Sequence, residues 1–443
     1  MGSTMENRLI EGMNHIAHDD GTHISESTRR KALSAAVVGN ILEWYDFAVY
    51  GFFATIISKH FFSATDPVTA LMATFATFGV GFAARPLGGI VIGRIGDKRG
   101  RKYALLLTMF LMAFSTMLIG TIPSYATIGA GATVAIVFAR ILQGFSAGGE
   151  WGGATAFIVE WARPDRRGYF GSFQQCSVAA GLLLGSAVAA VFSTLLSPED
   201  LESWGWRIPF LLGGILGPIG LYMRRTIDET PAFKAVSTAD TTEQEQEFDR
   251  PAKLAVKAFG FAIGWNVIYY IFLSYMPTFT TNYLKLSRSE ALWSNSIGLL
   301  VLVVAIPTMG SLSDRIGRKP LLLLCCAIFT FLSYPAFAYL LANPSFGVVI
   351  AMQIFFAISI ATFSGPGPAA IAEIFPTRIR STWMSIGYSL AAATFGGFAP
   401  FIATWMISKT GTPIAPVYYV IACSFVSGLV ILGLRETAHR KLY

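Results

Sequence analysis

GRIGDKRGRK at residues 93–102 and GSLSDRIGRK at residues 310–319 are two charged decapeptides of one design, each placed between long apolar runs. They lie about half of the 443-residue chain apart. A second pair, EWARPDRR at 160–167 and EIFPTRIR at 373–380, is separated by nearly the same interval. Repeats half a chain apart indicate a duplicated architecture. In a chain this apolar, two similar halves are typical of a transporter whose site lies between them.

The composition places most of the chain in a membrane. Hydrophobic residues make up 53% and charged residues only 13%, with a mean hydropathy of +0.55, whereas a soluble domain carries about 25% charged residues. The apolar runs are long enough to cross a hydrocarbon core as helices, and they lack the short alternating segments of a barrel. We predict an all-α membrane protein whose twelve spans cover residues 33–58, 68–93, 103–122, 128–158, 168–192, 207–224, 254–280, 290–311, 320–341, 345–373, 381–408 and 414–434.

The longest polar connection, residues 226–252, separates six predicted spans from six and has little to bury. We place the boundary between the halves there. The predicted organisation is a polar cytoplasmic tail at 1–30, an N-terminal six-helix bundle at 31–225, a cytoplasmic linker at 226–252, a C-terminal six-helix bundle at 253–435 and a cytoplasmic tail at 436–443.

The basic residues set the predicted orientation, since Lys and Arg concentrate in cytoplasmic loops. With the N-terminus inside, that side holds most of the 33 basic residues, which puts both termini in the cytoplasm. The basic residues left outside are Lys59, Arg207, Lys285, Arg288 and Lys409. The net charge of +7 then reflects topology and affinity for anionic membrane lipid, and it does not indicate a nucleic-acid partner.

Ionisable residues inside the predicted spans are the candidate functional groups, because placing one charged side chain at mid-membrane costs about 2.5–3.5 kcal/mol of insertion free energy. In the first span Glu43, Asp46 and Tyr50 share one helical face, and Asp46 lies near mid-depth. No histidine lies in any predicted span, so an embedded proton carrier must be a carboxylate. A carboxylate held between desolvation and a nearby cation can change protonation when that cation moves.

Two arginines fall inside the predicted spans. Arg140 and Gln143 lie on one face of the glycine-rich fourth span; we interpret Arg140 as facing a cavity, with a structural ion pair as the alternative. Arg85 closes the second span, where it either binds substrate or extends to the membrane surface. The polar groups at depth in the second half are neutral, and Asn266 and Tyr270 are interpreted either as cavity lining or as packing.

The repeated cytoplasmic charges predict an inner gate, closed by ion pairs among these residues when the outside is open. Exposed pairs contribute only about 0–1 kcal/mol each, which suits a gate that opens in every cycle. The alternative, a basic loop that only sets topology, explains the cations but not the matched acids. The predicted gate residues are Asp97, Arg101, Glu160 and Arg167 in the first half, and Asp314, Arg318, Glu373 and Arg380 in the second.

Several stretches taken together resemble one family: GNILEWYDFAVYGF, ARPLGG, RILQGFSAGGEWGG, SWGWRIPF, DETPAF and the two decapeptides. They are similar to the major facilitator superfamily and, within it, to the metabolite:proton symporter family. The resemblance covers residues 31 to 437. It implies two six-helix bundles around a central cavity, alternating access by a rocker switch, a bacterial-type inner membrane and action as a monomer.

The resemblance also implies roles for single residues. WYDFAVYG is similar to the first-helix motif of proton-coupled sugar porters, in which an aspartate faces an arginine of the fourth helix; these positions match Asp46 and Arg140. The same comparison assigns a substrate-contacting glutamine to Gln175. We expect Asp46, Glu43 and Arg140 to couple a proton. The predicted substrate-binding residues are Arg140, Gln143, Gln175, Tyr50, Asn266, Tyr270 and Arg85.

The known substrates of the family are small carboxylates and zwitterions. Arg at position 140 resembles the organic-acid members, whereas osmolyte members carry Lys, and a guanidinium suits bidentate recognition of a carboxylate. We therefore expect proton-coupled uptake of a di- or tricarboxylate. A proline- or betaine-type zwitterion, export or antiport, and sodium as the coupling ion remain alternatives. The chain stops at Tyr443 without heptads after the last span, so osmosensing is not expected.

The sequence does not predict an enzyme. The spans contain no nucleophile motif, nucleotide-binding loop or metal-ligand histidines, so we expect no cofactor and no metal. The expected partners are the substrate, protons and membrane lipid.

Overall fold

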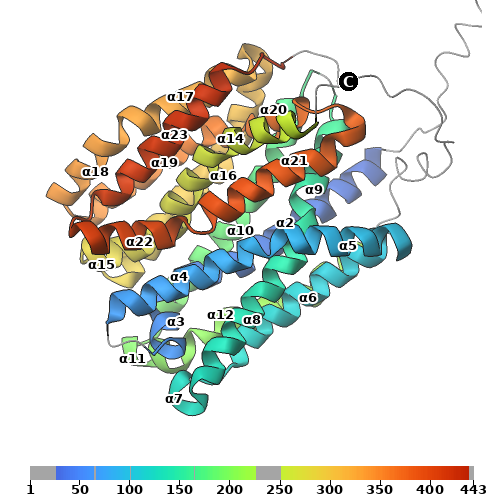
Figure 1. Cartoon of the computed structure of the whole chain (residues 1–443). Coiled ribbons are helices and arrows are strands. Elements are labelled where there is room, and N and C mark those ends of the chain that lie inside the picture. Colours follow the sequence, from blue (N-terminus) through green and yellow to red (C-terminus); the bar gives the residue numbers. More distant parts are fainter. Residues whose placement is uncertain (1–25, 64–65, 100, 164, 226–250, 439–443) are drawn as a thin grey trace, which may run out of the picture.

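The computed structural model describes residues 26–63, 66–99, 101–163, 165–225 and 251–438. Every regular element in this part of the chain is a helix, which confirms the predicted all-α fold (Figure 1). Most of the predicted tails and linker, at residues 1–25, 226–250 and 439–443, lies outside the described residues.

The first half consists of six spans, several of them divided into two helices. Pro86 follows the break between the two helices of the second span, where its missing N–H interrupts the helical hydrogen bonds. The spans are α2 (Glu26–Phe52) with α3 (Ala54–Phe61), α4 (Pro67–Ala83) with α5 (Arg85–Arg99), α6 (Arg101–Thr121), α8 (Ala130–Ser146) with α9 (Glu150–Trp161), α10 (Arg167–Leu195) and α12 (Arg207–Arg225). The short helices α7 (Tyr125–Ile128) and α11 (Pro198–Asp200) lie in connections.

The second half repeats this arrangement. Its spans are α14 (Pro251–Tyr269) with α15 (Met276–Tyr283), α16 (Arg288–Ile316), α17 (Arg318–Phe331) with α18 (Ser333–Ala342), α19 (Phe346–Ser364) with α20 (Gly367–Glu373), α21 (Thr377–Ala391) with α22 (Ala399–Thr410), and α23 (Ala415–Leu432). Segments of π-helix at Tyr270–Tyr275 and Ala392–Gly396 interrupt two of these spans. Such segments are frequent at functional sites.

The architecture is that of twelve membrane-spanning helices in two bundles. By length and composition, eight described helical stretches can cross a membrane, and the pair α17 and α18, bent by 46°, makes a ninth. The remaining predicted spans correspond to α2 with α3, to α6 and to α12.

The two halves lie side by side and touch at both ends of the bundle (Figure 1). Helix α10 of the first half runs along α16 of the second, and α4 lies along α22. At one end α9 also meets α20 and α21. At the other end the Arg288 guanidinium donates to the Thr55 hydroxyl over 2.6 Å.

Glycines let α4, α5 and α8 approach closely. A Cβ at Gly144 of α8 would overlap the carbonyl group of Gly81 in α4, and one at Gly88 of α5 would overlap that of Phe145. Gly81 also leaves room for Arg140, whose carbonyl oxygen would lie 3.0 Å and whose Nη2 would lie 3.4 Å from a Cβ there. Small residues at this seam therefore hold Arg140 in place.

Gly144→Ala is expected to lower the melting temperature of the purified protein in detergent, because the added methyl group forces α8 away from α4. Overpacking of this kind costs about 1–3 kcal/mol of folding free energy. Gly153→Ala is the matched control, since a Cβ at Gly153 meets nothing within 4 Å. Equal melting temperatures for the two variants would contradict this view of the seam.

Candidate functional site

A chain of polar side chains inside the first half joins the predicted acid to the predicted arginine. Arg140 Nη1 donates to Gln143 Oε1 over 2.6 Å, and Gln143 Nε2 donates to the Thr116 hydroxyl over 2.7 Å. That hydroxyl hydrogen bonds to the Asp46 carboxyl group. We call Asp46, Thr116, Gln143 and Arg140 the polar chain. It draws its members from α2, α6 and α8.

The polar chain is removed from the membrane and from solvent. Asp46 is 4% exposed, and Thr116, Gln143 and Arg140 are each 0% exposed. The acid and the arginine interact electrostatically, but the hydrogen bonds described between them pass through two neutral side chains. The structure thus brings Asp46 and Arg140 together, while their role in proton coupling stays a prediction.

Thr116 was not among the predicted site residues. It is one hydroxyl in a long apolar run, and hydroxyl side chains are common in membrane helices. Its importance comes only from the neighbours that α2 and α8 supply.

Aromatic rings surround both buried arginines. The Arg140 guanidinium carbon lies 4.9 Å from the ring centre of Phe47, 4.3 Å from Tyr50 and 5.0 Å from Phe78. For Arg85 these distances are 5.3 Å to Trp44, 4.7 Å to Phe47 and 4.2 Å to Phe82. Cations are attracted to ring faces within about 6 Å. The aromatic cage therefore consists of Trp44, Phe47, Tyr50, Phe78 and Phe82, completed by Tyr270, which packs 5.1 Å from Phe82.

Several polar atoms in this region are buried without a hydrogen-bond partner among the described residues. They are Nε and Nη2 of Arg140, Nε and Nη2 of Arg85, and Asp46 Oδ1. On α10, the predicted substrate contact Gln175 also has a buried Oε1 without such a partner. A buried donor or acceptor left unpaired costs about 1–3 kcal/mol, and more when it is charged. The arrangement is therefore suited to a polar ligand that supplies the missing partners.

Other predicted site residues have partners in the protein. The Tyr50 hydroxyl donates to the Thr74 carbonyl over 3.1 Å, so its ring rather than its hydroxyl faces Arg140. Asn266 donates to the Ala262 carbonyl of its own helix over 2.9 Å. Glu43 is 7% exposed and lines a cleft with Asp46 between α2, α6, α8 and α12.

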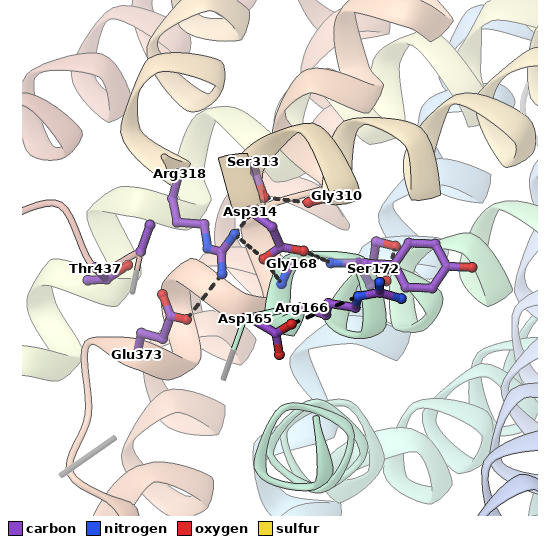
Figure 2. A network of polar contacts seen from close by, with 12 residues as sticks. Asp165, Arg166, Gly168, Ser172, Gly310, Ser313, Asp314, Arg318, Glu373 and Thr437 are labelled. Atoms are coloured by element: carbon purple, nitrogen blue, oxygen red, sulfur yellow. Dashed lines mark hydrogen bonds and ion pairs between the residues drawn. The ribbon is translucent and has the colours of Figure 1, made fainter. Parts of the chain in front are cut away.

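One part of the predicted gate forms a network across the halves (Figure 2). The Asp314 carboxylate at the end of α16 accepts hydrogen bonds from the backbone N–H groups of Gly168 and Tyr169, each over 2.8 Å. These groups open α10, so an acid of the second half caps a helix of the first. Arg318 Nη1 contacts Asp314 over 2.7 Å, and its Nη2 lies 3.5 Å from Glu373 Oε1.

The structure also describes the side chains of two further predicted gate residues, Arg380 and Arg167, while the role of the gate stays a prediction. Arg380 is fully buried and donates to the carbonyl oxygens of Ala372, over 2.8 Å, and Phe375, over 3.0 Å, within its own half. Arg167 is buried and interacts electrostatically with Glu373 across the halves. The side chains of the remaining predicted gate residues, Asp97, Arg101 and Glu160, lie outside those that the structure describes.

The predicted C-terminal tail begins as an anchored segment. Glu436 accepts the backbone N–H of Arg318 over 3.0 Å and that of Lys319 over 2.9 Å, and it thereby caps α17. Burial acts to raise the pKa of Glu436, but backbone N–H donors outweigh it and hold that pKa below its usual value. The Lys319 ammonium in turn donates to the carbonyls of Leu432 and Leu434 at the end of α23.

The structure contains an aromatic stack between the halves that the sequence did not predict. Trp151 of α9 stacks on Tyr388 of α21, with ring centres 3.5 Å apart and planes inclined by 3°. Trp265 of α14 packs edge-on against Trp151 at 6.2 Å. The stack therefore lies at the junction of the two halves, where α9 meets α21.

Two family models together match nearly the whole chain. The model described as "Sugar (and other) transporter" matches residues 31–253, and that described as "Major Facilitator Superfamily" matches residues 259–442.

Curated relatives are similar over almost the full length. The chain is 35% identical over 439 residues to a proline/betaine transporter of Salmonella typhimurium, covering 96% of this chain and 87% of the relative. It is equally similar to the glycine betaine/proline/ectoine/pipecolic acid transporter OusA of Dickeya dadantii, with the same coverage. The proline/betaine transporter of Escherichia coli K12 is 36% identical over 435 residues.

Solved structures show the same fold at lower identity. A partially occluded inward-open form of the E. coli xylose transporter XylE has a TM-score of 0.75 at 20% identity, covering 94% of this chain and all of that one. The XylE proton:xylose symporter bound to 6-bromo-6-deoxy-D-glucose has a TM-score of 0.76 at 19% identity, covering 95% of this chain and 98% of that one.

Proposed function

The chain belongs to the major facilitator superfamily of transporters, and on this premise we propose that it imports a small zwitterion of the proline or betaine type together with a proton. Like its relatives and the rest of its family, it is a transporter and not an enzyme. The observation that supports coupling best is the polar chain. Three hydrogen bonds in series link the buried Arg140 to Gln143, Gln143 to Thr116, and Thr116 to the buried Asp46.

The polar chain gives a physical route from a proton to a substrate site. A proton on Asp46 removes the negative charge that holds the Thr116 hydroxyl and attracts Arg140. Gln143 then has a weaker acceptor at Thr116, and Arg140 is freed to turn toward a ligand. Its unpartnered Nε and Nη2 form the edge that binds a carboxylate through two parallel hydrogen bonds.

The relatives favour the zwitterion alternative over the organic acid that Arg140 suggested. A zwitterion also carries one carboxylate, so an arginine at position 140 does not distinguish the two classes. The aromatic cage supports the zwitterion, because a quaternary or secondary ammonium group binds well against ring faces. A substrate with two carboxylates would bring a second negative charge toward Asp46 and Glu43, the two acids that line the neighbouring cleft.

Uptake into proteoliposomes tests the proposal. With an inward proton gradient, labelled proline or glycine betaine is expected to accumulate, and oxoglutarate, citrate and shikimate are expected not to compete. A sodium gradient without a proton gradient serves as the control for the coupling ion. Accumulation of a dicarboxylate instead, or accumulation driven by sodium alone, would contradict the proposal.

A further inference from the structure

The two buried arginines both lie close to one aromatic ring, that of Phe47. The guanidinium carbons of Arg140 and Arg85 lie 4.9 Å and 4.7 Å from the centre of the Phe47 ring. Arg140 is 0% exposed and Arg85 is 4% exposed. Each has the same two nitrogens, Nε and Nη2, buried without a hydrogen-bond partner among the described residues. Each therefore presents the edge that binds a carboxylate in a bidentate manner.

The two arginines start from different depths. Gly81 of α4 faces the backbone of Arg140, whereas the carbonyl of Arg85 faces Gly148. Gly148 follows Arg140 by two helical turns, or about 12 Å along a helix axis. The backbone of Arg85 is thus displaced toward the end where α9 meets α21 and where Asp314 caps α10.

We propose that Arg85 is a second carboxylate-binding residue, which receives the substrate carboxylate from Arg140 on the gate side of Phe47. This inference rests on the proposed function. Arg140 binds the carboxylate when the substrate enters, and Arg85 binds it before release at the gate. Phe47 is the ring around which the carboxylate passes.

Physical reasons favour two binding residues over one. A carboxylate that leaves Arg140 among the rings of the aromatic cage loses its hydrogen-bond donors, at a large cost in desolvation free energy. A second guanidinium close by lowers that cost. The two arginines repel each other, and the Phe47 ring, whose centre lies within 5 Å of both guanidinium carbons, offsets part of that repulsion. A single carboxylate therefore moves from one guanidinium to the other without an unpaired intermediate position.

Kinetics measured from each side of the membrane test the inference. In proteoliposomes of one orientation, Arg140→Lys is expected to raise the KM for labelled proline about tenfold from the entry side. Arg85→Gln is expected to raise the KM about tenfold from the gate side and to lower kcat, with the entry-side KM changed less than twofold. Arg85→Lys keeps the charge without the bidentate edge, and a partial return of the gate-side KM is expected.

The controls separate this inference from a structural effect. Lys257→Gln removes a cation at an exposed position of α14 and is expected to leave both KM values unchanged. Phe47→Leu provides an independent variant and is expected to slow turnover with little change in the entry-side KM. Equal changes of KM on both sides in Arg85→Gln would overturn the inference, as would no change on either side. Failure of the wild-type protein to transport proline or betaine would instead contradict the proposed function.

Discussion

Asp46→Asn is expected to abolish accumulation driven by a proton gradient while substrate exchange continues. The amide keeps the size and the hydrogen bond to Thr116 but cannot take up a proton. Since one pH unit corresponds to about 1.4 kcal/mol, a gradient of about two units supports up to about a hundredfold accumulation at one proton per substrate. The variant is expected to reach a ratio of about one, measured as labelled substrate retained in proteoliposomes.

Two further variants make this result specific. Glu43→Gln neutralises the other acid of the same helix face, and coupling is expected to survive, because the polar chain that joins an acid to Arg140 ends at Asp46. Thr116→Val keeps the acid and interrupts the polar chain, so accumulation is expected to fall without disappearing. Full accumulation by Asp46→Asn would show that another group takes up the proton.

The sequence was sufficient to predict the charged members of this site. Charged residues inside apolar spans are costly, so Asp46 and Arg140 were recognisable without a structure. Thr116 was not, because a hydroxyl in a membrane helix costs little and occurs for many reasons. Phe47 and Phe82 were hidden for a related reason, since phenylalanine is abundant in this chain and any ring in a span is compatible with packing.

The gate shows a second limit of sequence reasoning. The repeated decapeptides pointed to Asp314 and Arg318, and both lie in the network at the junction of the halves. The partners of Asp314 in the first half, however, are backbone N–H groups of α10, which have no signature in the residue types. Arg380 likewise binds carbonyl oxygens of its own half. The matched charges therefore predict where contacts between the halves gather, but not which groups make those contacts.

The substrate class was the least accessible feature. A buried guanidinium indicates a ligand with a carboxylate, and both candidate substrate classes carry a carboxylate. In the proposed function, the ammonium end of the ligand binds against rings from α2, α4 and the π-helix Tyr270–Tyr275, whose convergence depends on how the helices pack. Similarity over the whole chain therefore outweighs the residue at position 140.

Asp314→Asn is expected to shift the protein toward the state that is open on the gate side. Asp314 is 8% exposed. Its carboxylate caps the positive N-terminus of α10 through two N–H groups and also accepts a hydrogen bond from Arg318. The two N–H hydrogen bonds cross the halves, and a hydrogen bond to a charged group contributes about 1.5–3 kcal/mol. A shift of even about 3 kcal/mol changes the population ratio about a hundredfold.

Labelling of a cysteine at Ser172 measures this shift. Ser172 is fully buried on α10, and its side chain lies against Gly310 of α16 across the halves. In a background with Cys176, Cys325, Cys326 and Cys423 replaced, Ser172→Cys is expected to react with a membrane-permeant maleimide at least tenfold faster when Asp314→Asn is present.

The control lies in the same region. The Asp165 side chain is 57% exposed; it pairs with Arg163 over 3.2 Å and lies 4.0 Å from Arg166, which Figure 2 shows beside it. Such exposed pairs contribute about 0–1 kcal/mol each. Asp165→Asn is therefore expected to leave the labelling rate unchanged. If Asp314→Asn labels no faster than Asp165→Asn, the cap on α10 does not hold the two halves together. The closing interaction must then be sought in the stack of Trp151 on Tyr388.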